Sequence, residues 1–334
     1  MTMDLEPGPS ELRKAVASLR FDATVPRRLV HRAAVAETLL TDAVKVGDDR
    51  YVVAAQLPRA HALYNDGPAR YHDLLLLAEV VRQAGTLLSH RFYDVPEGFV
   101  FPLRRAQIEL VELGGMATSD AASEMVAEVR IADQERQSGV LSSMSLHAEL
   151  TIDGLKVGSA GGAMHFVSPS SYGTLRRNRP PADDGPAPAA AGRRVEPQRV
   201  GRRDVRNVVV GDVRRASEHE PYDCKIIADT RHSSFFDHPQ DHVPGMLLLE
   251  AYRQFALVAA ADACAWAPES LLVVACDAAF SRYAELDLEA RCSASVGEPV
   301  LPHRGNAWVP VSLKISQQGA TLSEATVRVA DVHR

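Results

Sequence analysis

The chain has 334 residues, a formal net charge of −6 and a hydrophobic content of 46%. This length allows two domains with separate cores, and the negative charge argues against nucleic acid as a partner. No apolar run approaches the roughly 20 residues of a transmembrane helix. The acidic, polar N-terminus is unlike a secretory signal, and the four cysteines lack C-x-x-C spacing. We therefore expect a cytoplasmic protein with reduced thiols and no membrane partner.

The predicted elements of the first half follow a tail at residues 1–25. Residues 29–42 fit a helix or a strand equally well, residues 50–57 fit a strand, and residues 74–90 fit an apolar helix. Alternating residues bounded by Gly, Asp and Ser then predict long antiparallel strands. These strands are expected at 99–113, 123–133, 139–151 and 154–167.

The second half repeats this order after a Pro-, Ala- and Arg-rich linker at residues 173–203. Two strands and a polar loop should precede a second apolar helix at residues 246–263. The strands of this half are expected at 205–213, 222–229, 271–284, 288–297, 307–318 and 320–332.

One motif occurs in both halves. Residues 58–83 (PRAHALYNDGPARYHDLLLLAEVVRQ) align without a gap with residues 229–254 (DTRHSSFFDHPQDHVPGMLLLEAYRQ), at an offset of 232 − 61 = 171. Such a duplication decides the architecture. We predict an α+β double hot-dog fold, in which each half wraps an antiparallel sheet around one long helix. Its domains, residues 26–172 and 204–334, would pack as a pseudo-dimer that could itself form a homo-oligomer.

Both copies of the motif end in E-x-x-R-Q on an apolar helix. Residues at i, i+3 and i+4 share one helix face, and an almost uniformly apolar helix is buried. Charged groups on it must be paired or line a cavity. The candidate site residues on these two faces are Glu79, Arg82 and Gln83 in the first half, and Glu250, Arg253 and Gln254 in the second.

The motif, together with the segments VHRAAVAETLLTD, QLPRAH and SHRFYDVPEGFVF, resembles the A-factor biosynthesis (AfsA-like) family. The resemblance implies an acyltransferase that moves a β-ketoacyl group from an acyl carrier protein to the hydroxyl of dihydroxyacetone phosphate. This step opens the biosynthesis of γ-butyrolactone, butenolide and furan signalling molecules. It implies no cofactor, and both substrates become expected partners.

A more distant likeness is to hot-dog dehydratases, whose catalytic Glu lies five residues after a Gly, as Glu250 follows Gly245. The dehydratase His position is occupied by Phe236, and the nearest histidine, His238, is two residues closer to that Gly. Its first-half equivalent is Gly67. A dehydratase or thioesterase acting on acyl thioesters, or a non-catalytic acyl- or lactone-binding protein, therefore stays open as an alternative.

Acyl transfer to an alcohol needs a base, and four residues are candidates: Glu79, Glu250, His232 and His238. Burial would raise the pKa of either glutamate towards a useful range, unless each simply pairs with its own arginine. The histidines could instead orient the glutamates or cap loop backbone. A hot-dog site usually takes one side chain from each half. Glu250 would then face the first-half loop, and Glu79 with His238 is the preferred site.

The remaining candidates would bind substrate. Arg82 and Arg253 could hold the phosphate bidentately, Gly245 could admit a thioester carbonyl, and Gln83, Gln254 and His61 could assist. Eight arginines between residues 193 and 215 could dock the acidic carrier protein, or form a solvated linker. The histidines and aspartates near residue 238 match no metal-site spacing.

Overall fold

The computed structural model describes residues 8–67, 70–179, 192–215, 217, 220–302 and 305–332. The chain divides into two compact units. The first contains Met1–Ala60 and Leu76–Arg179, and the second contains His61–Leu75 and Pro180–Arg334. The segment His61–Leu75, which the sequence placed in the first domain, therefore belongs to the second unit.

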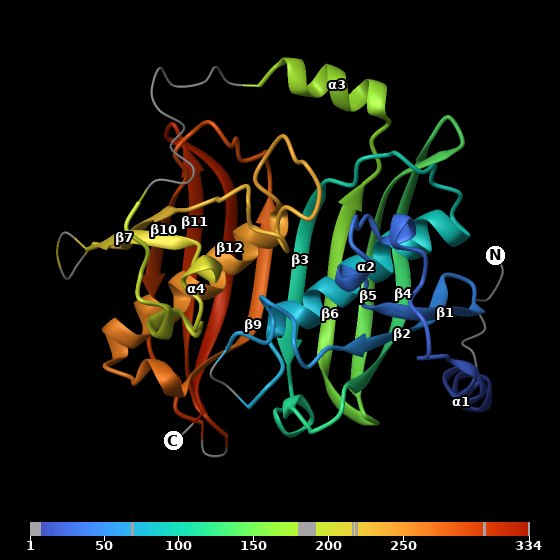
Figure 1. The fold of residues 1–334 in the computed structure, drawn as a ribbon, viewed down its shortest axis with the longest axis horizontal. Coiled ribbons are helices and arrows are strands. Elements are labelled where there is room, and N and C mark those ends of the chain that lie inside the picture. Colours follow the sequence, from blue (N-terminus) through green and yellow to red (C-terminus); the bar gives the residue numbers. More distant parts are fainter. Residues whose placement is uncertain are drawn as a thin grey trace. The chain divides into compact units, whose positions relative to one another are not determined.

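The first unit is an antiparallel sheet in the order β1-β2-β4-β5-β6-β3, with the long helix α2 against it (Figure 1). Its described elements are α1 (Pro9–Ser18), the 3₁₀ turns η1 (Arg27–Val30) and η2 (Val35–Glu37), β1 (Leu40–Gly47), β2 (Arg50–Leu57), α2 (Leu74–Phe92), β3 (Leu103–Leu110), η3 (Gly114–Met116), β4 (Ser123–Gln137), β5 (Val140–Ile152), β6 (Leu155–His165) and α3 (Pro169–Arg177). The predicted first-half helix and strands are thus confirmed in type and order.

Gly85 lets α2 pack closely on the sheet. A Cβ added at Gly85 would lie 2.6 Å from the Met164 side chain of β6 and 2.8 Å from the Leu146 side chain of β5. One turn later, Ser89 turns its hydroxyl back to the Gly85 carbonyl, 2.7 Å away. The apolar face of α2 therefore lies directly on β5 and β6.

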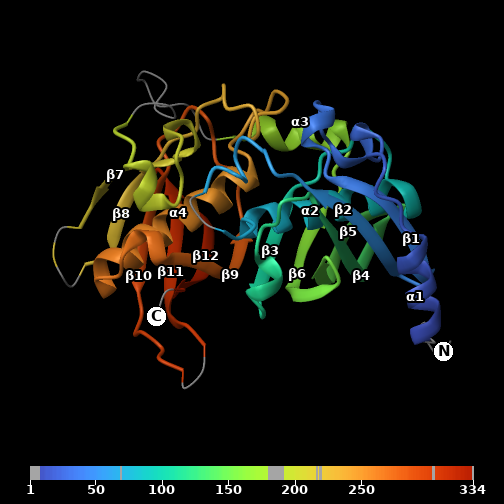
Figure 2. The same ribbon diagram turned by 60° about the horizontal axis from the view of Figure 1, so that its bottom comes forward.

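The second unit repeats the strand order of the first as β7-β8-β10-β11-β12-β9. Its elements are η5 (Pro197–Val200), η6 (Val205–Asn207), β7 (Val210–Arg214), β8 (Tyr222–Ile226), α4 (Gly245–Cys264), η7 (Pro268–Ser270), β9 (Leu271–Phe280), β10 (Arg291–Val296), β11 (Ala307–Gln317) and β12 (Ala320–Asp331). The same arrangement in both units supports the duplication inferred from the motif (Figure 2).

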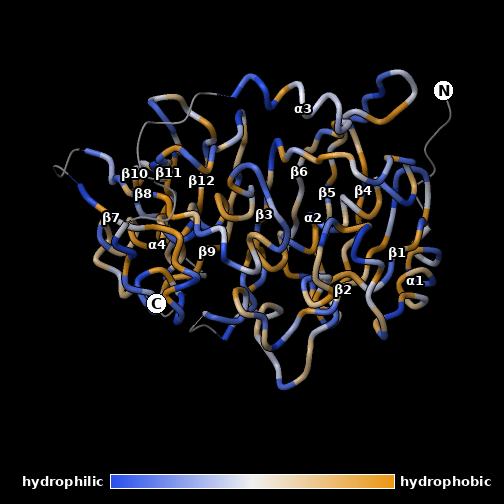
Figure 3. Tube along the Cα trace, turned by 45° about the horizontal axis from the view of Figure 1, so that its top comes forward, coloured by the Kyte–Doolittle hydropathy of each residue, from blue (hydrophilic) through white to orange (hydrophobic). Residues whose placement is uncertain are grey.

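Helix α4 forms the centre of the second core. Every residue from Met246 to Ala261 is buried, and the helix packs against β9, β10, β11 and β12. Its apolar composition is visible along the chain trace (Figure 3). A helix without a polar face is stable only inside a protein, so the polar side chains that α4 does carry need partners within the core.

Four local predictions differ from the structure. Residues 29–42 form neither a helix nor a strand throughout, because the two 3₁₀ turns precede β1 there, and 205–213 likewise begins with η6. The tail, residues 1–25, contains α1. The linker, residues 173–203, contains the end of α3 and all of η5, and its Arg202 is buried. Composition alone could not show that this arginine is held by a buried carboxylate.

None of the described helices is both long and apolar enough to cross a membrane.

Candidate functional site

Glu250 is the centre of a buried polar cluster in the second unit. Its carboxylate accepts hydrogen bonds from Nε and Nη2 of Arg202, at 2.9 and 2.8 Å, and from Nε and Nη2 of Arg253, at 2.8 and 2.7 Å. Gln254 donates a further bond of 2.5 Å. The glutamate is fully buried, as is the Arg202 side chain. Five charge-assisted or polar hydrogen bonds thus fix one carboxylate.

The cluster also ties α4 to the backbone that leads into β7. The Gln254 amide donates to the Asn207 carbonyl at 2.7 Å and accepts from the Val209 N–H at 2.9 Å. Arg253 donates to the Val200 carbonyl at 2.9 Å. These side chains therefore satisfy backbone groups that would otherwise be buried without partners.

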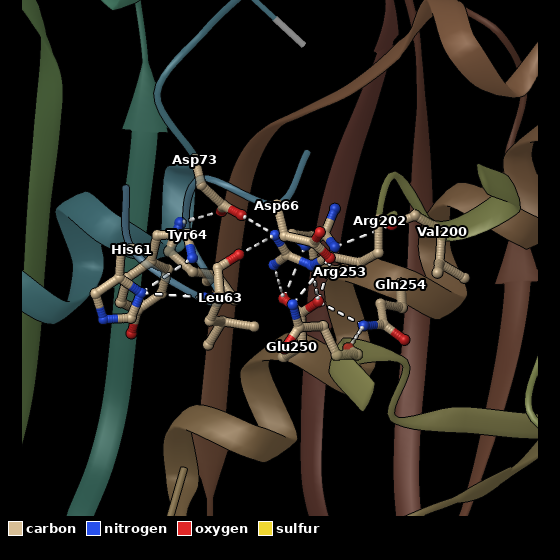
Figure 4. Close-up of polar contacts among 12 residues, drawn as sticks. His61, Leu63, Tyr64, Asp66, Asp73, Val200, Arg202, Glu250, Arg253 and Gln254 are labelled. Atoms are coloured by element: carbon tan, nitrogen blue, oxygen red, sulfur yellow. Dashed lines mark hydrogen bonds and ion pairs between the residues drawn. The ribbon is translucent and has the colours of Figure 1, made fainter. Parts of the chain in front are cut away.

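Arg202 extends the cluster to the first-half loop (Figure 4). Its Nη1 lies 2.8 Å from both the Leu63 carbonyl oxygen and the Asp73 carboxylate. Both groups belong to the segment His61–Leu75 of the second unit. Arg202 thus connects Glu250 to the first-half loop, which is the loop that Glu250 was expected to face.

Of the two alternatives for the glutamates, a pKa raised by burial or pairing with arginine, the geometry favours pairing. Burial by itself raises the pKa of Glu250, but the charges of Arg202 and Arg253 and their hydrogen bonds outweigh it and lower the pKa to about 2. A carboxylate that is ionised and fully occupied by donors is a weak proton acceptor near pH 7. The alternative reading, in which the glutamate pairs with its own arginine, describes this geometry.

The first unit contains a second copy of the cluster. Glu79 is bound by Arg32 (2.5 Å to Nη2), Arg82 (2.8 Å to Nε) and Gln83 (2.7 Å). Gln83 also donates to the Glu37 carbonyl and accepts from the Leu39 N–H, as Gln254 does with its own backbone partners. Burial favours the neutral acid, yet the two arginines hold the pKa of Glu79 well below its usual range.

The second arginine of each cluster was missed from the sequence. Arg32 and Arg202 are separated by 202 − 32 = 170 residues, whereas the motif repeats at 171. At the motif offset of 171, Arg32 aligns with the neighbouring Arg203, so that offset points to the wrong arginine. Aligning LVHRAAVAETLLTD with RVGRRDVRNVVVGD at an offset of 170 would have revealed the correspondence.

The two copies differ in the exposure of the motif arginine. The Arg82 side chain is 23% exposed, and the Arg253 side chain is 9% exposed. Arg82 is therefore the more accessible of the two candidate phosphate ligands.

His61 and His232 both cap loop backbone. His61 Nδ1 accepts from the N–H groups of Leu63 and Tyr64, and its ring stacks on Tyr64. His232 Nδ1 makes the equivalent bonds to the next turn of its own loop, and its Nε2 lies 2.9 Å from the Asn207 side-chain oxygen. Both rings thus hold their loops in shape through Nδ1.

His238 is more accessible, with 39% of its side chain exposed. Its Nε2 lies 2.7 Å from the Gln240 amide nitrogen, and its Nδ1 lies 3.6 Å from the buried Asp237 carboxylate. Gly245 is the first residue of α4, after Pro244, and no side chain caps this end. The suggested pairing of Glu79 with His238 joins residues of different units and stays a prediction.

Several arginines of the segment between residues 193 and 215 form ion pairs with aspartates of the same unit. These pairs are Arg199–Asp262, Arg206–Asp204 and Arg214–Asp223, beside the buried Arg202. Their role in carrier-protein docking stays a prediction.

Over the described ranges, no group of three or more His, Cys, Asp or Glu side chains is arranged to hold a metal ion.

Each unit has six antiparallel strands in the same order and one long apolar helix against them, and two such units define a double hot-dog protein. The family described as "A-factor biosynthesis hotdog domain" matches the chain twice, over residues 14–168 and 184–332. The chain belongs to this A-factor biosynthesis hot-dog family.

Curated relatives cover most of the chain. A 2-oxo-3-(phosphooxy)propyl 3-oxoalkanoate synthase from Streptomyces virginiae is 35% identical over 266 residues, which are 79% of this chain and 85% of the relative. A synthase of the same name from Streptomyces coelicolor is 30% identical over 275 residues, 81% of this chain and 82% of the relative. A solved hot-dog protein of unknown function from Alicyclobacillus acidocaldarius is similar with a TM-score of 0.47 at 12% identity, covering 89% of this chain and 98% of that chain.

Proposed function

We propose that this protein is an acyltransferase that joins a 3-oxoacyl group to the free hydroxyl of dihydroxyacetone phosphate. The observation that carries the proposal is its identity of 30–35% to synthases whose name describes that ester, over about four fifths of the chain. The family and the reaction implied by the sequence resemblance agree with these names.

The reaction balances without a cofactor. The hydroxyl oxygen attacks the thioester carbonyl, a C–O bond forms, and the C–S bond breaks. The hydroxyl proton is transferred to the departing thiolate. The protein must therefore supply a base, donors for the transient oxyanion and a cation for the phosphate.

The base that we propose is His238. The glutamates are ionised and surrounded by arginine and glutamine donors, whereas His238 is part-exposed and carries an imidazole, the commonest general base in enzymes. Its Nδ1 faces the buried carboxylate of Asp237 at 3.6 Å, which would stabilise the imidazolium that forms on proton transfer. Substrate hydroxyl would replace the Gln240 amide at Nε2.

The N-terminus of α4 and the arginine on α2 are proposed for the other tasks. Gly245 and Met246 are the first two residues of α4, and a helix N-terminus favours negative charge. Their backbone N–H groups are proposed to donate to the thioester carbonyl oxygen. Arg82, the more exposed motif arginine, is proposed to bind the phosphate.

The donor of the acyl group is proposed to be an acyl carrier protein, as the family resemblance implies. We also propose the cytoplasm as the location, because the four cysteines are free thiols, as is usual in a reducing compartment.

The proposal is tested by mass spectrometry of purified protein incubated with a 3-oxoacyl thioester, with and without dihydroxyacetone phosphate. The expected product is the phosphorylated ester or its cyclised form, only when the acceptor is present. Release of free acid regardless of the acceptor would instead identify a thioesterase. An unchanged thioester, on a small thiol and on carrier protein alike, would contradict an enzymatic role.

A further inference from the structure

The segment His61–Leu75 is fastened to the second unit by buried charges. Asp73 uses one oxygen to accept the Leu75 N–H at 2.8 Å, at the start of α2. Its other oxygen lies 2.8 Å from Arg202 Nη1. Arg202 in turn is bound to Glu250 by two hydrogen bonds. A continuous chain of contacts therefore runs from Leu75 to Glu250, in the second turn of α4.

Asp66 fastens the same segment at a second point. Its carboxylate accepts the N–H groups of Arg203 and Asp204, each at 3.1 Å, and the Asn207 amide at 2.8 Å. The Asn207 amide also donates to the Ala62 carbonyl at 2.7 Å. The carboxylate of Asp66 thus holds the turn that follows Arg202. The Ala62 carbonyl holds the same turn through Asn207.

The charges of this cluster cancel. Two carboxylates, Glu250 and Asp73, face two guanidinium groups, Arg202 and Arg253, and the Arg202 side chain is fully buried. The residue equivalent to Asp73 in the second copy of the motif is Pro244 (73 + 171 = 244). The second carboxylate is therefore a feature of the Glu250 cluster that the motif repeat does not reproduce.

We propose that Arg202 is a positioning residue and that Glu250 and Asp73 serve as its anchors. Together they fix the loop that contains His61, up to Leu75, within the second unit. A buried, neutral cluster has no surplus charge for a phosphate, so the Glu250 cluster sets geometry and does not bind the acceptor. This inference rests on the proposed acyl transfer only for its kinetic consequence.

The first test needs no substrate. Hydrogen exchange of amides in residues 61–67 is measured for wild type and for Asp73→Asn, which removes the charge facing Arg202. Exchange about tenfold or more faster in this segment is expected. The matched control is Asp262→Asn, which breaks an ion pair with Arg199 at the exposed C-terminal end of α4, and it should leave the segment unchanged. Equal exchange in wild type and Asp73→Asn would overturn the positioning role.

The second test separates positioning from binding and from stability. For Asp73→Asn we expect kcat to fall by about tenfold to a hundredfold, because small displacements of reacting groups cost that much. The KM for dihydroxyacetone phosphate should stay within twofold, and Asp73→Glu should recover part of the lost kcat. A KM that rises with kcat unchanged would make the cluster a phosphate site and overturn the inference. A wild-type protein that makes no ester would defeat the proposed function, while hydrogen exchange would still decide the positioning role.

Discussion

Replacement of Glu250 by glutamine is the sharpest perturbation of the second unit. The side chain keeps its shape and one oxygen but loses its charge. The guanidinium groups of Arg202 and Arg253 then lose the carboxylate that both contact, inside a core from which water is excluded. Breaking a buried ion pair by removing one partner is costly, because the other charge stays buried.

The magnitude follows from the pKa of Glu250. It titrates at about 2 in the folded protein, against 4.5 for an ordinary glutamate. Such a difference corresponds to about 3 kcal/mol in the free energy of unfolding at neutral pH. For a unit of this size, a loss of about 3 kcal/mol lowers the midpoint of thermal unfolding by roughly 6–12 °C.

The assay is thermal unfolding of wild type and Glu250→Gln from pH 7 down to pH 2. The folded-state pKa is depressed, so the stabilisation is fully present above pH 4.5 and is lost as the pH falls towards 2. The gap between the two proteins should therefore be widest at pH 7 and close in acid. The control is Glu324→Gln, which removes an exposed pair with Lys314 and should cost less than about 1 kcal/mol.

Two results would refute this reasoning. One is a Glu250→Gln protein as stable as wild type at pH 7, which would mean that the arginines find equal partners without the charge. The other is a stability gap that does not change with pH, which would mean that glutamine is destabilising through its shape. A loss of activity with no loss of stability would return Glu250 to the list of candidate bases.

Four further outcomes are expected. Arg202→Lys, measured by thermal unfolding, should destabilise the second unit by about 2–4 kcal/mol, because lysine cannot bridge two carboxylates and a carbonyl as a planar fork does. His238→Gln should lower kcat about a hundredfold or more with an unchanged unfolding temperature, whereas the neighbouring His242→Gln should have little effect on turnover. Arg82→Lys should raise the KM for dihydroxyacetone phosphate more than that for the thioester, and equal changes would count against phosphate binding. Gly158→Ala should impair folding, scored as soluble yield and unfolding temperature, because a Cβ there would lie 2.1 Å from the Glu109 carbonyl oxygen of the neighbouring strand.

Most of the fold could be predicted because its signals are local and occur twice. An apolar helix of 19 or 20 residues and a long alternating strand can each be predicted from their own sequence pattern, without knowledge of what they pack against. The structure of residues 29–42 and 205–213 could not be predicted in this way, because short 3₁₀ turns produce no repeating pattern of apolar residues. Their shape depends on Gln83 and Gln254, which bond to their backbone from the helices.

The chemistry of the glutamates could not be predicted from their helix alone. Burial without a cation raises the pKa of a carboxyl group, and burial beside two cations lowers it. The deciding residues, Arg32 and Arg202, lie 47 and 48 residues earlier in the chain, as 79 − 32 = 47 and 250 − 202 = 48. Arg202 moreover stands in a stretch whose composition is typical of a linker. Only the fold brings these arginines to the helix.

The features that the two copies share and those that differ point to different roles. Both copies place one glutamate between two arginines, and both use a glutamine to hold the backbone that enters the first strand. A geometry built alike in both halves is explained by the fold that both halves need. Catalysis must instead distinguish an acyl thioester from a phosphorylated alcohol, and identical sites cannot do so. It should therefore be sought where the copies diverge: at His238 against Gly67, at Asp73 against Pro244, and at the unequal exposure of the motif arginines.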